Sequence, residues 1–216
     1  MRFNERLAEG KFSEQLAISL KGLALDVHGP LMEQLLDLPT EHSVLTAMSE
    51  VACGTVRSIG ARELLDMGYR TFATDAEFSY QFLPGAQRLS FKLVSDTRDM
   101  AELRVSMTLA NMSEKPSDLI VNPPRVALLA LEVDDNQYQR KVQSYCAGRL
   151  AQGSEHYLQT AVEKFDQVLC SQRIMLDPLV LAAYASYLKD PQSLRLELNP
   201  TEGMTWDGLE FLRLRM

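Results

Sequence analysis

Apolar and polar residues alternate with a period of two from residue 69 to residue 109, and this alternation constrains the fold more than any other feature of the chain. Three runs carry it, at 72–82, 89–93 and 103–109, and the turn sequences LPGAQ and DTRD separate them. A period of two is typical of strands that pack one face on a core and turn the other to water. The sequence therefore predicts an antiparallel β-meander.

Further strands are expected on both sides of this meander. Residues 126–133 (VALLALEV) predict a fourth strand that is apolar on both faces, and residues 194–198 predict a short last one. Between residues 15 and 27 the apolar positions change phase at Lys21–Gly22, as they would in a strand with a β-bulge. A helix over the same residues is the alternative, because their apolar positions also fit a helical stripe.

Helical periodicity returns after Asp135. Three helices are expected, over 138–149, 154–169 and 178–188, and shorter ones at 31–37, 41–51 and 61–67, the last ended by a left-handed Gly68. The sequence 206–216 fits either a short strand or a short helix. We therefore expect one α+β domain over residues 1–216, in which an antiparallel meander packs against about three amphipathic helices.

Charge and hydropathy exclude several classes of protein. The formal net charge of −7 leaves no broad positive field for nucleic acid, so no nucleic-acid partner is expected. The longest apolar runs fall far short of the roughly 20 residues of a membrane-spanning helix. The first ten residues lack the apolar core of a secretory signal. The chain is expected in the cytoplasm if it is the complete gene product, or in the envelope if it is part of an exported one.

The residues that usually carry chemistry are scattered along the chain. Three cysteines, at 53, 146 and 170, form no C-x-x-C pair, and His28, His42 and His156 stand apart from one another. Zinc sites usually take paired ligands, and a nucleophilic Cys53 would need a base within reach. No phosphate-binding loop or G-x-S-x-G elbow is present. We therefore predict no catalytic residue, metal or cofactor, and keep a cysteine-dependent hydrolase built on Cys53 as an alternative.

The cysteines also raise the question of a disulfide. Cys146 and Cys170 fall on consecutive predicted helices at different distances from their connecting turn, which sets them roughly 15 Å apart along the helix axes. A disulfide needs Cα atoms within about 7 Å, so this pair is disfavoured. Cys53 and Cys146 form the freer pair in an oxidising compartment, whereas in the cytosol all three thiols stay reduced. Cys170 is then expected in the core.

One docking surface is expected, and an apolar cavity is an alternative. Strand 69–82 is a candidate edge of the sheet, so Thr74 and Ala76 are candidate docking positions for a partner protein or a second copy. The long aromatic and aliphatic row of the meander is by default a packed core. The alternative is a cavity for an apolar ligand such as a lipid, so that the chain would be a carrier.

Two short segments near the ends of the chain resemble each other. LALDVHGP, at 23–30, and LRLELNP, at 194–200, both read Leu-x-Leu-acid followed by a proline exit. Two unrelated strands would also give this match. The alternative is a repeat unit that begins and ends with similar strands and stacks on other such units in a longer protein or assembly.

Four segments together resemble uncharacterised proteobacterial envelope proteins of the broad YdgA-like or AsmA-like kind. They are Cys53–Gly54, the L-x-x-x-G-Y helix end at 64–69, Tyr-Cys-Ala at 145–147 and the S-L-x-L-x-L-x-P strand at 193–200. The resemblance implies a periplasmic, β-rich, non-catalytic domain with a membrane anchor upstream. We therefore expect an envelope domain that scaffolds or binds a partner protein.

Overall fold

The computed structural model describes residues 13–30, 53, 59–171, 177–200 and 203. The two short helices expected at 31–37 and 41–51, His42 and the last segment, 206–216, lie outside these residues. The elements follow one another as β1 (Gln15–Asp26), α4 (Ala61–Asp66), β2 (Thr71–Leu83), η1 (Pro84–Ala86), β3 (Arg88–Thr97), β4 (Ala101–Ala110), η2 (Pro116–Ile120), β5 (Arg125–Asp135), α5 (Tyr138–Arg149), α6 (Ser154–Ser171), α7 (Pro178–Lys189) and β6 (Ser193–Leu198).

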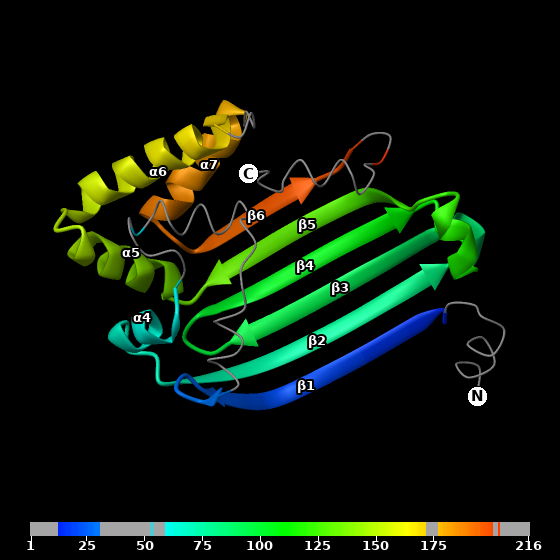
Figure 1. The fold of residues 1–216 in the computed structure, drawn as a ribbon, viewed down its shortest axis with the longest axis horizontal. Coiled ribbons are helices and arrows are strands. Elements are labelled where there is room, and N and C mark those ends of the chain that lie inside the picture. The colour runs from blue at the N-terminus through cyan, green and yellow to red at the C-terminus, as the bar shows by residue number, and fades with distance from the viewer. Residues whose placement is uncertain (1–12, 31–52, 54–58, 172–176, 201–202, 204–216) are drawn as a thin grey trace.

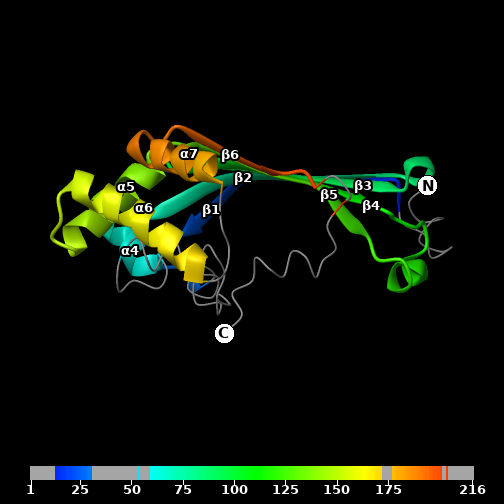
Figure 2. The same cartoon turned by 90° about the horizontal axis from the view of Figure 1, so that it is seen from above.

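The six strands form one antiparallel sheet in the order β1-β2-β3-β4-β5-β6, so each strand pairs with its neighbours in the sequence. Among the described elements, the helices α4, α5, α6 and α7 gather at one end of the sheet and the turns η1 and η2 lie at the other, as Figure 1 shows. Figure 2 shows the sheet edge-on, with α4 and α6 on one side of it. The α+β class and the meander predicted from the sequence are confirmed.

The pairing register brings like side chains to one face of the sheet. Ile18 of β1 pairs with Phe78 of β2, Phe78 with Leu93, Leu93 with Val105, Val105 with Leu131, and Leu131 with Leu196 of β6. This row of apolar side chains crosses all six strands. We call the side of the sheet that carries it the apolar face.

The opposite side of the sheet is polar and carries a group of ion pairs. Arg104 lies 2.7 Å from both Glu102 and Asp134, and Arg195 lies 2.7 Å from Glu197. The hydrogen bonds that the Arg104 guanidinium donates to the Asp134 and Glu102 carboxylates raise its pKa. Because the pairs are exposed or half-exposed, each contributes little to stability. They mark the side of the sheet that faces water.

Two separate cores cover the two ends of the apolar face. The helical core joins the helices to the sheet end near Phe72, and its buried residues are Val27, Cys53, Leu64, Met67, Tyr69, Phe72, Val142, Cys146, Ala147, Tyr157, Ala161 and Leu188. The tip core lies at the other end, under the loop that contains η2, and consists of Phe82, Leu89, Leu109, Met112 and Val126. The sheet between them has no such cover in the described part of the chain.

Several local predictions are confirmed. The register of β1 against β2 shifts between Leu20 and Leu23, so the predicted bulge is present and the helical alternative is wrong. Gly68, at φ 89°, ends α4 in the left-handed conformation. The start of α7 at Pro178 is also as expected, since the Asp177 carboxylate accepts a hydrogen bond from the Leu179 N–H at 2.8 Å.

The expectation that Cys170 lies in the core is wrong. Its thiol is free and exposed on α6. The apolar residues just before it suggested burial, but a helix turns by about 100° per residue, so neighbours in sequence need not share a face. The Cys170 thiol lies 3.9 Å from the Asp166 carboxylate, one turn earlier on α6.

Gly22 allows a test of the bulge. It has φ +64°, and an added Cβ would meet no atom within 4 Å, so the left-handed backbone is its only constraint. We expect Gly22→Ala to lower the free energy of unfolding by about 1–2 kcal/mol, the cost of a left-handed residue with a Cβ. Gly85→Ala is the control, since Gly85 also has open space but no positive φ. Equal denaturant midpoints for the two variants would contradict this account.

Candidate interaction surface

Strand β2 is not an edge of the sheet, so the predicted docking at its edge is wrong. Thr74 pairs with Leu23 of β1 and with Thr97 of β3, and Ala76 pairs with Leu20 and Ser95. Both residues therefore lie on a strand that has a neighbouring strand on each side, and neither is at an edge. The expectation failed because β1 adds to the meander outside β2, and only a long-range pairing determines this. The real edges are β1 and β6.

The centre of the apolar face is open. Ile18 is 50% exposed, Leu93 37% and Leu196 42%, although all three belong to the row that crosses the six strands. Leu20 is 54% exposed and Leu23 43% exposed on the same face of β1. Large contiguous apolar patches on a protein surface are typical of binding sites. The sequence showed the apolar row but not its exposure, because exposure depends on where the covering helices pack, and the described ones pack at one end of the sheet.

Three aromatic rings lie together on this face. The centroids of Phe78, Tyr80 and Phe91 are 6.2–6.5 Å apart, within the range of favourable tilted and edge-on contacts. The three rings are partly exposed, so they form a rigid aromatic platform beside the open row. The Tyr80 hydroxyl also hydrogen-bonds the buried Ser13 side chain just before β1. This bond fixes the ring at the margin of the face.

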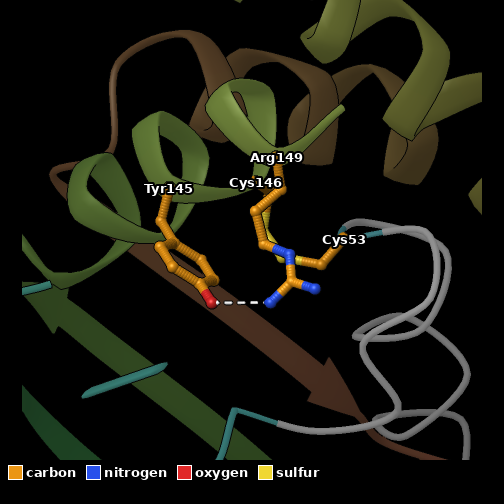
Figure 3. Close-up of a disulfide and its surroundings, with 4 residues drawn as sticks. All are labelled: Cys53, Tyr145, Cys146 and Arg149. Carbon is orange, nitrogen blue, oxygen red and sulfur yellow. Dashed lines mark hydrogen bonds between the residues drawn. A yellow bond between two sulfur atoms is a disulfide. The ribbon is translucent and has the colours of Figure 1, made fainter. Parts of the chain in front are cut away.

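The second site that the sequence suggested is a disulfide between Cys53 and Cys146. The two Cα atoms lie 4.7 Å apart, and both side chains are buried in the helical core. Figure 3 shows the bond beside Tyr145 and Arg149 of α5, where the Arg149 guanidinium donates to the Tyr145 hydroxyl at 3.0 Å. The bridge ties Cys53, ahead of the meander, to the helix that follows it. This pairing, which the sequence left dependent on the compartment, is therefore present.

The disulfide changes what Cys53 can do. A cysteine acts as a nucleophile in its thiolate form, and a sulfur bonded in a disulfide is not a thiolate. The described histidines do not add a site, because His28 follows β1 at an exposed turn and His156 is exposed on α6. Within the described residues no three His, Cys, Asp or Glu side chains are grouped as a metal would require. The cysteine-dependent hydrolase would need Cys53 to be released by reduction.

Polar contacts fix the junction between α5 and the sheet. The Tyr69 hydroxyl donates to the Asp99 carbonyl at 3.0 Å, and the Lys141 ammonium lies 4.0 Å from the centre of the Tyr69 ring. Burial is the main cause that raises the pKa of Tyr69 to about 12. The Asp135 carboxylate accepts hydrogen bonds from the backbone N–H groups of Gln137 and Gln139 and so caps α5. These contacts have structural roles and leave the open apolar face as the strongest candidate site.

The fold places the chain in the class of α+β domains built on a single antiparallel meander. No family model, no curated protein and no solved structure matches the chain. None of the helices in the described residues is both long and apolar enough to cross a membrane. The function therefore has to be argued from the surface itself.

The disulfide can be tested through stability. Cys53 and Cys146 are 93 residues apart in the sequence, and closing so long a loop restricts the unfolded chain strongly. We expect Cys146→Ala to lower the free energy of unfolding by about 2–5 kcal/mol, measured by denaturant titration. Cys170→Ser, at the exposed free thiol, is the matched control and should leave the midpoint unchanged. A Cys146→Ala midpoint equal to that of the control would show that the bridge does not stabilise the fold.

Buried tyrosines predict a loss of stability at high pH. Burial raises the pKa of Tyr69, Tyr157, Tyr184 and Tyr187 to about 12, whereas a tyrosine in an unfolded chain ionises near pH 10. A raised pKa stabilises the fold fully below pH 10, and this contribution is lost as the pH rises from about 10 to 12. Tyrosinate absorbance should show these four groups ionising late or together with unfolding seen by circular dichroism. Ionisation of all seven tyrosines near pH 10 in a folded chain would contradict the prediction.

Proposed function

We propose that this chain is a non-enzymatic domain of the bacterial envelope that binds a partner protein through the open centre of its apolar face. The observation that carries the proposal is the row from Ile18 to Leu196, which crosses six strands. Ile18, Leu93 and Leu196 in it are exposed, and the other three members are partly exposed. An isolated exposed leucine is ordinary, but a row of six apolar side chains in register, none of them buried, is not. A partner that covered the row would remove this apolar area from water.

The disulfide supports the envelope as the compartment. Stable disulfides form in the periplasm and outside the cell and are rare in the reducing cytosol. The Cys53–Cys146 bridge is buried and closes a long loop, which is typical of a structural rather than a catalytic disulfide. The resemblance to proteobacterial envelope proteins points to the same compartment. The proposal assigns no catalytic residue and no cofactor.

The physical chemistry of the face favours binding through a few anchors. Interfaces draw most of their affinity from a small group of well-packed aromatic and aliphatic side chains. Phe78, Tyr80 and Phe91 supply rigid rings, and Leu93 lies beside Phe78 in the open row. Burial of a leucine is worth about 1.5–3 kcal/mol. The ion pairs on the opposite face would stay in water and help to orient the domain.

An apolar ligand such as a lipid is the second candidate for the same face. The aromatic platform favours it, because a flat group of partly exposed rings suits hydrocarbon as well as protein side chains. The two candidates differ in what purified protein carries. Native mass spectrometry would find a bound small molecule with the carrier and a polypeptide with the interaction domain.

Leu93→Lys tests the role of the face. It places a charge in the middle of the open row, so we expect recovery of a partner from envelope extracts to fall at least about tenfold, equivalent to about 1.4 kcal/mol. Lys92→Glu is the matched control, because Lys92 is the preceding residue of β3, is also exposed, and lies on the polar face. It should leave recovery unchanged. Equal recovery by both variants, with unchanged circular dichroism, would remove the apolar face from the proposal.

A further inference from the structure

The outer edge of β1 differs from ordinary sheet edges. Its first half, Gln15–Leu20, reads QLAISL and contains no charged residue and no proline. Ile18 and Leu20 in it are at least half exposed. Natural proteins usually protect an edge strand with charges, prolines or a bulge, because an unprotected one pairs readily with another strand. In β1 these devices begin only at Lys21, where the bulge starts.

The backbone of this segment is arranged to accept another strand. The Phe82 N–H donates to the Glu14 carbonyl at 2.7 Å, which makes Glu14 and Phe82 a hydrogen-bonded pair. Because such pairs alternate along an antiparallel ladder, Leu16, Ile18 and Leu20 turn their backbone groups toward β2. Gln15, Ala17 and Ser19 then turn theirs outward, away from the sheet. The Gln15 carbonyl accepts a long hydrogen bond from the Ser13 hydroxyl at 3.4 Å, which uses one of its two lone pairs. The three outward residues therefore still offer donors and acceptors to one further strand.

The other edge of the sheet is protected. Strand β6 is half as long as β1, and its outward residues include Arg195 and Glu197, which are both charged. The hydrogen-bonded pair Asp135–Gln192 sets this alternation on β6. Helix α7 also contacts β6 and lies beside it in both views, Figure 1 and Figure 2. Added strands are therefore expected at β1 and not at β6.

We propose that two copies of this chain pair edge to edge through Gln15–Leu20 of β1, antiparallel, about a two-fold axis beside Ala17. The two six-stranded sheets would become one continuous sheet. In this register Ala17 faces Ala17 of the second copy, Gln15 faces its Ser19, and Leu16 faces its Ile18. A symmetric interface must be complementary to itself, and this one is.

Three features favour a second copy as the occupant. The segment has no charge, so the two-fold axis sets no like charges opposite each other, which would be unfavourable. Ala17 is small, and the Gln15 amide can hydrogen-bond the Ser19 hydroxyl of the second copy. The outward residues all carry their side chains on the polar face, so pairing keeps the two apolar faces on the same side. Their open rows then join across the axis through Leu16 and Ile18.

The bulge limits the interface to this segment. Gly22 has φ +64°, and its N–H donates to the Asp75 carboxylate at 2.6 Å, which holds the bulge in place. A bulge twists a strand and interrupts its ladder. The second half of β1, from Leu23, therefore diverges from the line of the first. Ala24 provides a control there, because it is exposed and on the polar face like Ala17 but lies beyond the bulge.

A cysteine scan tests the register directly. The background is Cys170→Ser, which removes the exposed free thiol and leaves the native disulfide. In the proposed dimer two copies of Ala17 are a hydrogen-bonded pair with Cα atoms about 5.5 Å apart, within the range of a disulfide. We expect Ala17→Cys to give a covalent dimer on a non-reducing gel under mild oxidation, and Ala24→Cys to remain monomeric. Equal cross-linking at both positions, or none at Ala17→Cys, would overturn the proposal.

A charge test completes the experiment without cross-linking. Light scattering should give a dimer for the unmodified chain and a monomer for Ala17→Lys, which places two lysines opposite each other at the axis. Ala24→Lys should remain a dimer. A monomer for the unmodified chain at every concentration, or a dimer for Ala17→Lys, would overturn the proposal. The result is independent of the proposed function, since partner recovery depends on Leu93 in the middle of the sheet and not on its edge.

Discussion

The alternation of apolar and polar residues along six strands, held in register, is the constraint on which the rest of the structure depends. Side chains along a strand alternate between the two faces of the sheet. A slip of one residue in any pairing would therefore move all the apolar side chains of that strand to the face exposed to water. The bulge at Lys21–Gly22 absorbs a change of phase in β1 and keeps both of its halves on the same face. One continuous apolar face results, and both the open row and the outer edge of β1 belong to the sheet that carries it.

The two ends of the apolar face are buried, whereas its middle is exposed. The helices bury one end and fix it with the Cys53–Cys146 bridge, and the loop containing η2 buries the other end over Phe82. These two cores provide the stability that a lone sheet lacks, since such a sheet needs cover on at least one face. The centre is then free to bind. The open row from Ile18 to Leu196 and the rings of Phe78 and Phe91 therefore lie between two packed cores, one at each end of the sheet.

Much of the fold could be predicted from the sequence because it rests on local signals. The periods of two and 3.6, the proline at the start of α7 and the glycine after α4 all act within a few residues of the position that they specify. The two wrong expectations have different causes. The pattern predicts an edge at Thr74 and Ala76, but β1, from a distant part of the chain, pairs there. The apolar neighbours of Cys170 predict burial, but the helix turns its side chain outward.

The sequence by itself determined the strands, their apolar and polar sides, the bulge and the main helices, because hydrophobic periodicity and turn chemistry are local. Only the tertiary structure decided which strands lie at the edges, that Cys53 meets Cys146, and that the middle of the apolar face stays open. The edges and the disulfide depend on contacts between residues distant in sequence, and the exposed middle depends on how far apart the two cores lie on the sheet. An alternating strand reads the same whether its apolar side is packed or exposed, so its pattern alone could not distinguish a core from a binding surface.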